Sequence, residues 1–455
     1  MDQGDRGRGG PESQEIIQEL FLNTGGLVGA VTSVEGTGQL ITGTRNDESG
    51  WSILPPGPGR EKTTAATAAA ASLGNRLTVH TIRDTGGRVL GLGSSSSLRA
   101  AGTGGGGGGE GGDEDAVVGR LESVAEAWAP HEGAVTGVDV AGGGFESLGG
   151  VSGVVTSGGD GCLRLFELTP GDDFDEDEDG SPGDGPSLGL VGQVPTHSDR
   201  ATGVAATRRR AVTVGEDGVA SVVDLQRLAD DHGGSAGGGV GGGLVWTGRT
   251  KGAMPLSGVT FQGESEEVFA TVGCNPRGQL LVWDARTDGS RPVVRGALGC
   301  IRGSEAPYLC VASQPFAPEV FACGVSTGEV IVWDVRTGVP LHELQAQDET
   351  SAAGGSWGVT FHPRSPRHLF SCSGTGVLTK WYMPPEGQAH EPAAVDGGEW
   401  GGGGWESLRG ARHLYELPSR SGLVGVCYDE TADTIAAVSK HGHVVVAHGV
   451  AGLRL

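Results

Sequence analysis

A five-residue segment of this sequence has a spacing that could carry hydrolytic chemistry. Gly324–Gly328 reads Gly-Val-Ser-Thr-Gly, the G-x-S-x-G pattern that presents a nucleophilic serine in α/β-hydrolases. A working nucleophile requires a sharp strand-to-helix turn there, with an acid and a histidine further along the chain. Here the segment lies between two runs of strand-forming residues, so it predicts a turn between strands.

The cysteines and histidines do not have the spacing of a metal site. No CxxC pair occurs among the seven cysteines, which stand at positions 162, 274, 300, 310, 323, 372 and 427. The glycine-rich runs are not followed by Gly-Lys-Ser/Thr, and no βαβ unit surrounds them, which argues against phosphate binding. The sequence therefore predicts no enzyme, no catalytic residue, no metal, no cofactor and no small-molecule substrate.

Two histidines instead predict structural hydrogen bonds. His131 and His197 each precede a segment that reads as the first strand of a repeat, and an Asp-Gly turn follows at Asp160 and at Asp217. Asp-Gly pairs favour tight turns between antiparallel strands. We expect each histidine to bond the aspartate of its own repeat and to stabilise that turn.

The elements around these residues form a repeat. Residues 278–287 (GQLLVWDART) and 328–337 (GEVIVWDVRT) are near copies, so Trp283-Asp284 recurs fifty residues later as Trp333-Asp334. Trp381 ends a similar run after another 48 residues. Apolar strands that end in Trp-Asp at this period are typical of WD40 β-propeller blades. Propellers mostly bind other proteins, and their fold by itself implies no catalysis.

The pattern predicts an all-β, seven-bladed WD40 propeller over 26–455, after a disordered segment 1–25. Leu27–Val34 is expected to close the ring as an outer strand, and Trp51–Ile82 to form the first blade. The other predicted strands are Val151–Gly159, Cys162–Leu168, Ala211–Gly215, Val219–Leu225, Pro255–Phe261, Glu267–Gly273, Leu280–Asp284, Tyr308–Ala312, Val320–Gly324, Val330–Asp334, Trp357–Pro363, His368–Ser373, Val377–Trp381, Leu423–Tyr428, Thr434–Ser439 and His443–His448.

Long insertions rich in Gly, Ser, Asp or Pro separate some strands. Glycine makes up 87 of 455 residues, far above its usual share of about 7%. Such runs cannot bury enough apolar surface to offset chain entropy, so they are expected to be disordered. The predicted insertions cover about 91–115, 169–190, 232–243 and 383–410.

Charge and hydropathy restrict the partners. A net charge of −24 argues against nucleic acid, because phosphate binding needs a basic face. Arg208–Arg210 is a tight basic cluster that fits a solvated turn.

Membrane insertion is not predicted. No apolar run approaches the roughly 20 residues that span a bilayer, and the first residues lack the apolar core of a signal peptide. Free cysteines suit a reducing compartment. These features predict a soluble intracellular protein without membrane insertion.

Four segments stand out from the generic repeat, in this order: Trp51–Gly57 (WSILPPG), Thr213–Gly218 (TVGEDG), Phe361–Ser373 (FHPRSPRHLFSCS) and Leu417–Ser421 (LPSRS). Together they resemble the nucleoporin-forty-three family of WD-repeat proteins, in the Y-shaped scaffold complex of the nuclear pore. The resemblance covers roughly residues 49–450. It implies a seven-bladed scaffold propeller that binds a helical-solenoid nucleoporin, in the nucleus at the nuclear envelope, with no catalysis or cofactor.

The resemblance also suggests contact residues and shows two departures. Trp51, Leu417, Pro418 and Arg420 belong to the matching segments, and they either contact the partner or help to close the ring. Gly374–Gly376 replaces the acidic turn expected in the sixth blade, which removes one structural hydrogen bond. The glycine-rich insertions are not a feature of the family.

Two other binding functions fit particular segments. Arg286 and Arg336 complete Trp-Asp-x-Arg strings that resemble the adaptor-docking box of substrate receptors in cullin-type ubiquitin ligases. That role requires both arginines to be exposed on one rim. The acidic run 172–179 could instead serve a histone- or peptide-binding propeller, which would need an acidic or aromatic channel mouth.

Overall fold

The computed structural model covers the chain in segments that lie mostly within blades. It describes residues 16–21, 27–34, 39–45, 76–83, 120–128, 130–141, 152–169, 186–232, 242–274, 280–295, 306–344, 354–383, 407–408, 411–417, 421–429 and 434–448. Within these segments no helix is long and apolar enough to cross a membrane.

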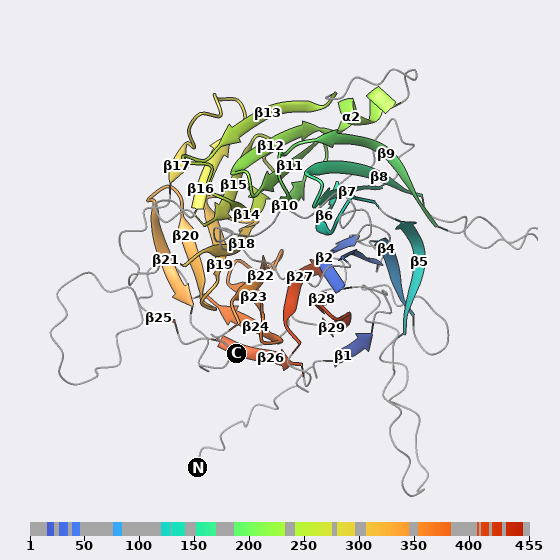
Figure 1. Cartoon of the computed structure of the whole chain (residues 1–455). Helices are drawn as coiled ribbons and strands as arrows, with labels where there is room; N and C mark the ends of the chain where they lie inside the picture. The colour runs from blue at the N-terminus through green and yellow to red at the C-terminus, as the bar shows by residue number, and fades with distance from the viewer. Residues whose placement is uncertain are drawn as a thin grey trace, which may run out of the picture.

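Seven antiparallel sheets stand around a central axis as the blades of a propeller (Figure 1). This confirms the predicted all-β, seven-bladed fold. Each blade starts with its innermost strand, and successive strands pair outward. The innermost strands are β2, β6, β10, β14, β18, β22 and β27.

Blades 1 to 4 are contiguous in sequence. Their strands, from the axis outward, are β2 (Leu27–Val34), β3 (Gln39–Arg45), β4 (Arg76–Arg83) and β5 (Arg120–Trp128) in blade 1; β6 (Val135–Ala141), β7 (Ser152–Gly158), β8 (Cys162–Thr169) and β9 (Ser187–Pro195) in blade 2; β10 (Ala201–Ala206), β11 (Arg210–Gly215), β12 (Val219–Asp224) and β13 (Leu244–Arg249) in blade 3; and β14 (Leu256–Phe261), β15 (Val268–Gly273), β16 (Leu280–Asp284) and β17 (Val294–Arg295) in blade 4.

Blades 5 to 7 follow the same plan with two additions. Their strands are β18 (Tyr308–Ser313), β19 (Val320–Val325), β20 (Val330–Asp334) and β21 (Val339–Leu344) in blade 5, with β25 (Ser407–Leu408) parallel to β21; β22 (Ser356–Phe361), β23 (His368–Ser373), β24 (Val377–Tyr382) and β26 (Ala411–Glu416) in blade 6; and β27 (Leu423–Asp429), β28 (Thr434–Ser439), β29 (His443–His448) and β1 (Ile16–Phe21) in blade 7.

The ring closes with a different strand from the one predicted. β1 pairs antiparallel with β29 over six residues, from Ile16↔His448 to Phe21↔His443. Leu27–Val34 is instead the innermost strand of blade 1, which therefore begins well before Trp51. The prediction of disorder over 1–25 was wrong at 16–21. Both segments have strand propensity, and only the pairing of the two chain ends decides which one closes the ring.

The predicted insertions were too long at their ends. Residues 187–190 belong to β9, and Ser407–Leu408 forms β25. His232 ends a helix, α2 (Leu225–His232), so the predicted strand that ran to Leu225 stops at Asp224. Asp224 Oδ1 accepts the backbone N–H of Arg227 at 3.0 Å, which caps the helix in the way aspartate often does. Most of 91–115, 169–190, 232–243 and 383–410 lies outside the described residues.

The core lies between neighbouring blades, where both faces of each sheet are covered. One cluster joins Val212 and Val222 of blade 3 to Phe269 and Trp283 of blade 4. The tryptophans of the repeat, Trp283, Trp333 and Trp381, are each 1% exposed. Burial on both faces explains why these strands read as continuous apolar runs.

A bulge in every innermost strand shapes the centre of the ring. The residue after the bulged one is glycine in five of the blades and cysteine in blade 5. At that residue the innermost strands of adjacent blades come close together. A Cβ at Gly137 would lie 2.9 Å from Val204 N of the next blade, and one at Gly425 would lie 2.8 Å from Val31 Cγ1. Glycine is needed because the blades approach closely at the axis.

A carboxylate between blades 2 and 3 predicts a pH effect. Asp139 on β6 accepts the N–H of Ala206 on β10 at 2.8 Å, and burial raises its pKa to about 6. Because the folded pKa exceeds the unfolded one, stability from this group falls as pH rises from about 4 to 6. Asparagine cannot ionise, so the Asp139→Asn variant should not lose this stability. We expect the difference in free energy of unfolding, variant minus parent, to rise by about 2 kcal/mol as pH rises across that window.

Chemical denaturation of both proteins at several pH values would measure this difference. Taking the difference cancels the opposite trend from the buried histidines, which both proteins share. A difference that stays constant with pH would contradict the role given to Asp139.

Candidate functional site

The signature tryptophans hold neighbouring strands together. Trp283 Nε1 donates to Thr271 Oγ1 at 2.9 Å, and Trp381 Nε1 donates to Ser371 Oγ at 2.8 Å. In both blades the tryptophan lies opposite an apolar residue of the adjacent strand, Phe269 or Leu369. The hydroxyl that accepts its N–H belongs to the residue two positions after that apolar residue. These side chains stabilise blades and are too buried to contact a ligand.

Blade 5 lacks this bond. Cys323 stands where the hydroxyl would be, and Trp333 Nε1 has no acceptor at hydrogen-bonding geometry. The ring of Tyr308 lies tilted against Trp333, with centroids 6.5 Å apart. Burial raises the pKa of the Tyr308 phenol. Trp333 therefore acts mainly through packing, with the Tyr308 hydroxyl as a weak partner of its indole N–H.

The predicted histidine–aspartate pairs are within bonding distance. His131 Nδ1 lies 2.9 Å from Asp160 Oδ1, and its Nε2 lies 2.7 Å from Thr156 Oγ1. His197 bonds Asp217 at 3.1 Å in blade 3. Burial lowers the pKa of His131, while bonds from His131 and Arg164 hold the pKa of Asp160 below its usual range. Each aspartate also accepts backbone N–H groups, so these residues fix turns.

Blade 1 contains a related residue that the sequence reading missed. His80 occupies the register position of the tryptophan, opposite Leu40, and its Nε2 lies 2.9 Å from Thr42 Oγ1. Burial lowers its pKa to about 4. A histidine in that position carries no local sequence signal, and only strand register reveals its equivalence to Trp283.

The segment with hydrolase spacing forms a turn. Ser326 lies between β19 and β20, and its N–H donates to Pro307 O at 3.0 Å. Gly328 has a φ of 101°, which favours glycine. Among the described residues no group of three His, Cys, Asp or Glu side chains could hold a metal.

The arginines of the Trp-Asp-x-Arg strings fold back onto their own aspartates. Arg286 donates to both carboxylate oxygens of Asp284, at 2.9 and 2.7 Å. Arg336 bonds Asp334 and also pairs with Glu319 at 3.0 Å. Their side chains are 67% and 59% exposed, at equivalent positions of adjacent blades. They are accessible on one side of the ring, but their donors are already engaged.

The residues from the family-like segments are not grouped by the structure. Leu417 is fully buried in the core between blades 6 and 7, so it cannot contact a partner as suggested. Trp51, Pro418 and Arg420 lie outside the described residues. The acidic run 172–179 also lies outside them. Within the basic cluster, Arg210 pairs with Glu267.

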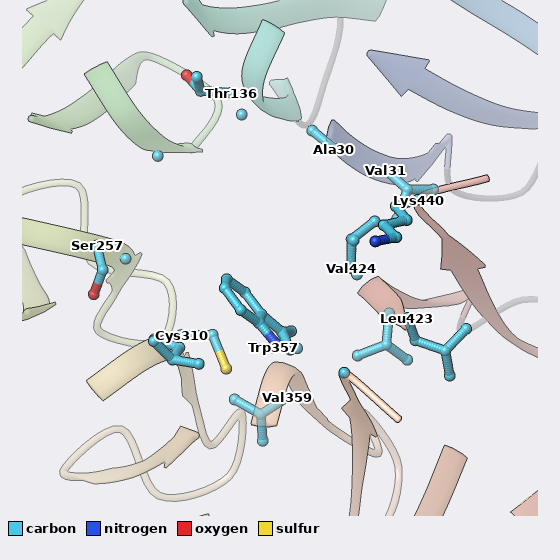
Figure 2. Close-up of a pocket in the computed structure, with 18 of the residues that line it drawn as sticks. Ala30, Val31, Thr136, Ser257, Cys310, Trp357, Val359, Leu423, Val424 and Lys440 are labelled. Carbon is cyan, nitrogen blue, oxygen red and sulfur yellow. The ribbon is translucent and has the colours of Figure 1, made fainter. Parts of the chain in front are cut away.

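Among the described residues, those around the central channel enclose a space of the size of a ligand pocket. Its volume is about 830 Å³, within the range of roughly 300–1,000 Å³ common for ligand sites. In blades 2 to 7 the bulged residue of the innermost strand lines the channel, and Figure 2 labels Thr136, Ser257, Trp357 and Val424 among them. The bulged residues are polar in blades 2 to 4 and apolar in blades 5 to 7: Thr136, Thr202, Ser257, Leu309, Trp357 and Val424.

Some channel residues tie each blade to the next. Thr202 Oγ1 donates to Leu256 O at 2.7 Å, and Ser257 Oγ donates to Tyr308 O. Cys310 Sγ lies 3.4 Å from Ser356 O. These donors are used within the ring, which leaves the apolar half and the channel mouth for a ligand.

Comparison with known proteins finds two nucleoporins. The chain is 34% identical over 181 residues to "Nucleoporin Nup43" of Mus musculus, covering 40% of this chain and 41% of that protein. It is 35% identical over 181 residues to the Homo sapiens protein of the same name, with the same coverage. A "Ribosome biogenesis protein WDR12 homolog" of Chlamydomonas reinhardtii is 27% identical over 248 residues, half of each chain.

No protein-family model matches the sequence. The chain spans about two fifths of the length of the nucleoporins that it matches. Blades 4 and 5 carry the Trp-Asp pair of WD repeats, and the ring has the seven sheets of a propeller. Together they support a WD-repeat, nucleoporin-like protein.

Proposed function

We propose that this chain is a non-catalytic scaffold propeller of the nuclear pore complex. It binds other nucleoporins, in particular a helical-solenoid subunit of the Y-shaped complex, and so supports nucleocytoplasmic transport from the nuclear envelope. The observation that carries the proposal is the 34–35% identity to nucleoporins within a seven-bladed propeller. Such rings hold other proteins, and the residues that resembled a catalytic segment form a turn.

Gentle affinity purification of the tagged protein from its own cells tests this proposal. We expect helical-solenoid and propeller nucleoporins to come with it in a fixed ratio. Recovery of a cullin-ligase adaptor without nucleoporins would contradict the proposal and would return attention to Arg286 and Arg336. Recovery that disappears on mild salt washing would also count against a stable scaffold role.

The outer edge of blades 2 to 4 is the first contact surface to test. Leu190 on β9 is 46% exposed, Leu244 on β13 is 37% exposed, and Val293 beside β17 is 52% exposed. Exposed apolar side chains on successive outer strands suit a partner that lies along the rim.

Charge substitutions on this edge separate it from other exposed surfaces. We expect Leu190→Glu with Leu244→Glu to reduce nucleoporin recovery at least about tenfold, because each carboxylate would be desolvated on binding. Phe316→Glu is the matched control, since Phe316 is 55% exposed in the turn between β18 and β19. Equal recovery from all three proteins would rule out this edge.

A further inference from the structure

The described residues that line the channel carry a positive charge, whereas the whole chain is strongly negative. The protein has a net charge of −24, yet no described residue that lines the channel is Asp or Glu. Lys440 lines it, together with His441 and His443. A channel whose described lining has a lysine and no carboxylate attracts anions, and its low-dielectric walls strengthen that effect.

The turns between second and third strands differ in charge from blade to blade. In blade 3 that turn carries Glu216 and Asp217, whereas the equivalent positions in blade 7 are Lys440 and His441. In blade 6 they are Gly374 and Thr375. Ser373 Oγ lies 2.7 Å from Thr375 Oγ1 and accepts the N–H of Val377 at 3.2 Å. Hydroxyls therefore brace this turn, which carries no carboxylate.

Small residues allow close backbone packing where blades 6 and 7 meet. A Cβ at Gly374 would lie 2.8 Å from Trp357 Nε1, and one at Gly422 would lie 2.6 Å from Gly374 O. The N–H of Lys440 donates to Gly422 O at 3.2 Å. The turn before β24 in blade 6 therefore packs against the segment before β27 in blade 7. Trp357 of β22 lies beside that turn, and the backbone of Lys440 bonds that segment.

The indole of Trp357 is oriented into the channel. Its Nε1 donates to Gly354 O at 2.8 Å, which fixes the ring. Figure 2 shows this ring reaching toward the middle of the channel, with Val424 and Lys440 on the adjoining wall. An apolar surface beside a cation is complementary to an apolar side chain flanked by carboxylates.

We infer that the channel mouth between Trp357 and Lys440 binds an acidic peptide segment of a partner protein. An aromatic or aliphatic residue of the segment packs on Trp357, and a neighbouring carboxylate pairs with Lys440. A basic peptide, such as a histone tail, would find no carboxylate among the described lining residues. A bare inorganic anion would use Lys440 but not the apolar half of the channel. The inference does not rest on the nuclear-pore role.

Fluorescence anisotropy with a labelled peptide tests the site. The probe is fluorescein-Asp-Glu-Phe-Glu-Asp, and its counterpart has lysine at each acidic position. We expect the acidic probe alone to bind the full chain at low ionic strength. Lys440→Glu should weaken binding at least about tenfold, because attraction is replaced by repulsion. Lys251→Glu is the matched control, since Lys251 is exposed on the loop before β14 and does not line the channel.

Two further measurements distinguish the peptide site from simpler causes. Trp357→Leu should also weaken the acidic probe, and Lys440→Glu should gain affinity for the lysine probe. Circular dichroism would verify that each variant is folded. No binding by the parent protein, equal binding by Lys440→Glu, or full displacement by inorganic phosphate would each overturn the inference. If the parent protein binds the acidic probe but recovers no nucleoporins on affinity purification, the proposed scaffold role fails and the peptide site stands.

Discussion

Replacing Trp381 with alanine is expected to lower the free energy of unfolding by about 3–5 kcal/mol. Trp381 is 1% exposed and packs between blades 5 and 6, in a cluster with Leu369 and Phe361. Alanine would remove the ring and leave a cavity that rigid sheets cannot fill. It would also leave the Ser371 hydroxyl without its tryptophan donor. Urea denaturation followed by circular dichroism would measure the change.

A phenylalanine series separates packing from hydrogen bonding. Trp381→Phe and Trp283→Phe each remove a bonded indole N–H, and we expect a loss of about 2–3 kcal/mol for each. Trp333→Phe removes an N–H that has no acceptor at hydrogen-bonding geometry, so its loss should be smaller by about 1 kcal/mol. Equal losses at all three positions would show that the hydrogen bonds contribute little.

Deleting residues 1–21 is expected to open the ring. β1 supplies the outer strand of blade 7 through six paired residues on β29. Each lost backbone hydrogen bond costs about 1 kcal/mol, so the total approaches about 5 kcal/mol. The exposed edge of β29 would also favour association between molecules. Thermal unfolding and size-exclusion chromatography would record both effects.

Two controls test whether β1 itself is responsible. A deletion of residues 1–15 keeps every paired residue of β1 and should unfold like the parent protein. A synthetic peptide of residues 1–21 added to the shorter chain should restore stability by pairing with β29. Unchanged unfolding of the shorter chain would show that the described pairing does not close the ring.

The channel and the rim suggest a division of binding surfaces. The rim of blades 2 to 4 exposes apolar side chains that suit a permanent helical partner, while the channel mouth suits an acidic segment. The Lys440 and Leu190 variants test these surfaces separately, because the two residues lie on strands or turns of different blades.

The blade count and most strand positions followed from the sequence alone. Apolar runs ending at Trp283, Trp333 and Trp381, and turns such as Asp160-Gly161, are local signals with a fixed period. Local signals also placed His131 and His197 near their aspartates, because each pair lies within one repeat. The predicted strand 219–225 was one residue too long, because Asp224 caps the helix that follows it.

Only the tertiary structure decided how the ring closes and what its channel presents. Whether Ile16–Phe21 or Leu27–Val34 pairs with the last blade depends on a contact between chain ends, which no local pattern encodes. The role of His80 depends on strand register, and the burial of Leu417 depends on a neighbouring blade. That Trp357 and Lys440 line the same channel depends on close packing between blades 6 and 7. Such properties arise from contacts between distant residues, so they become visible only when the blades are assembled.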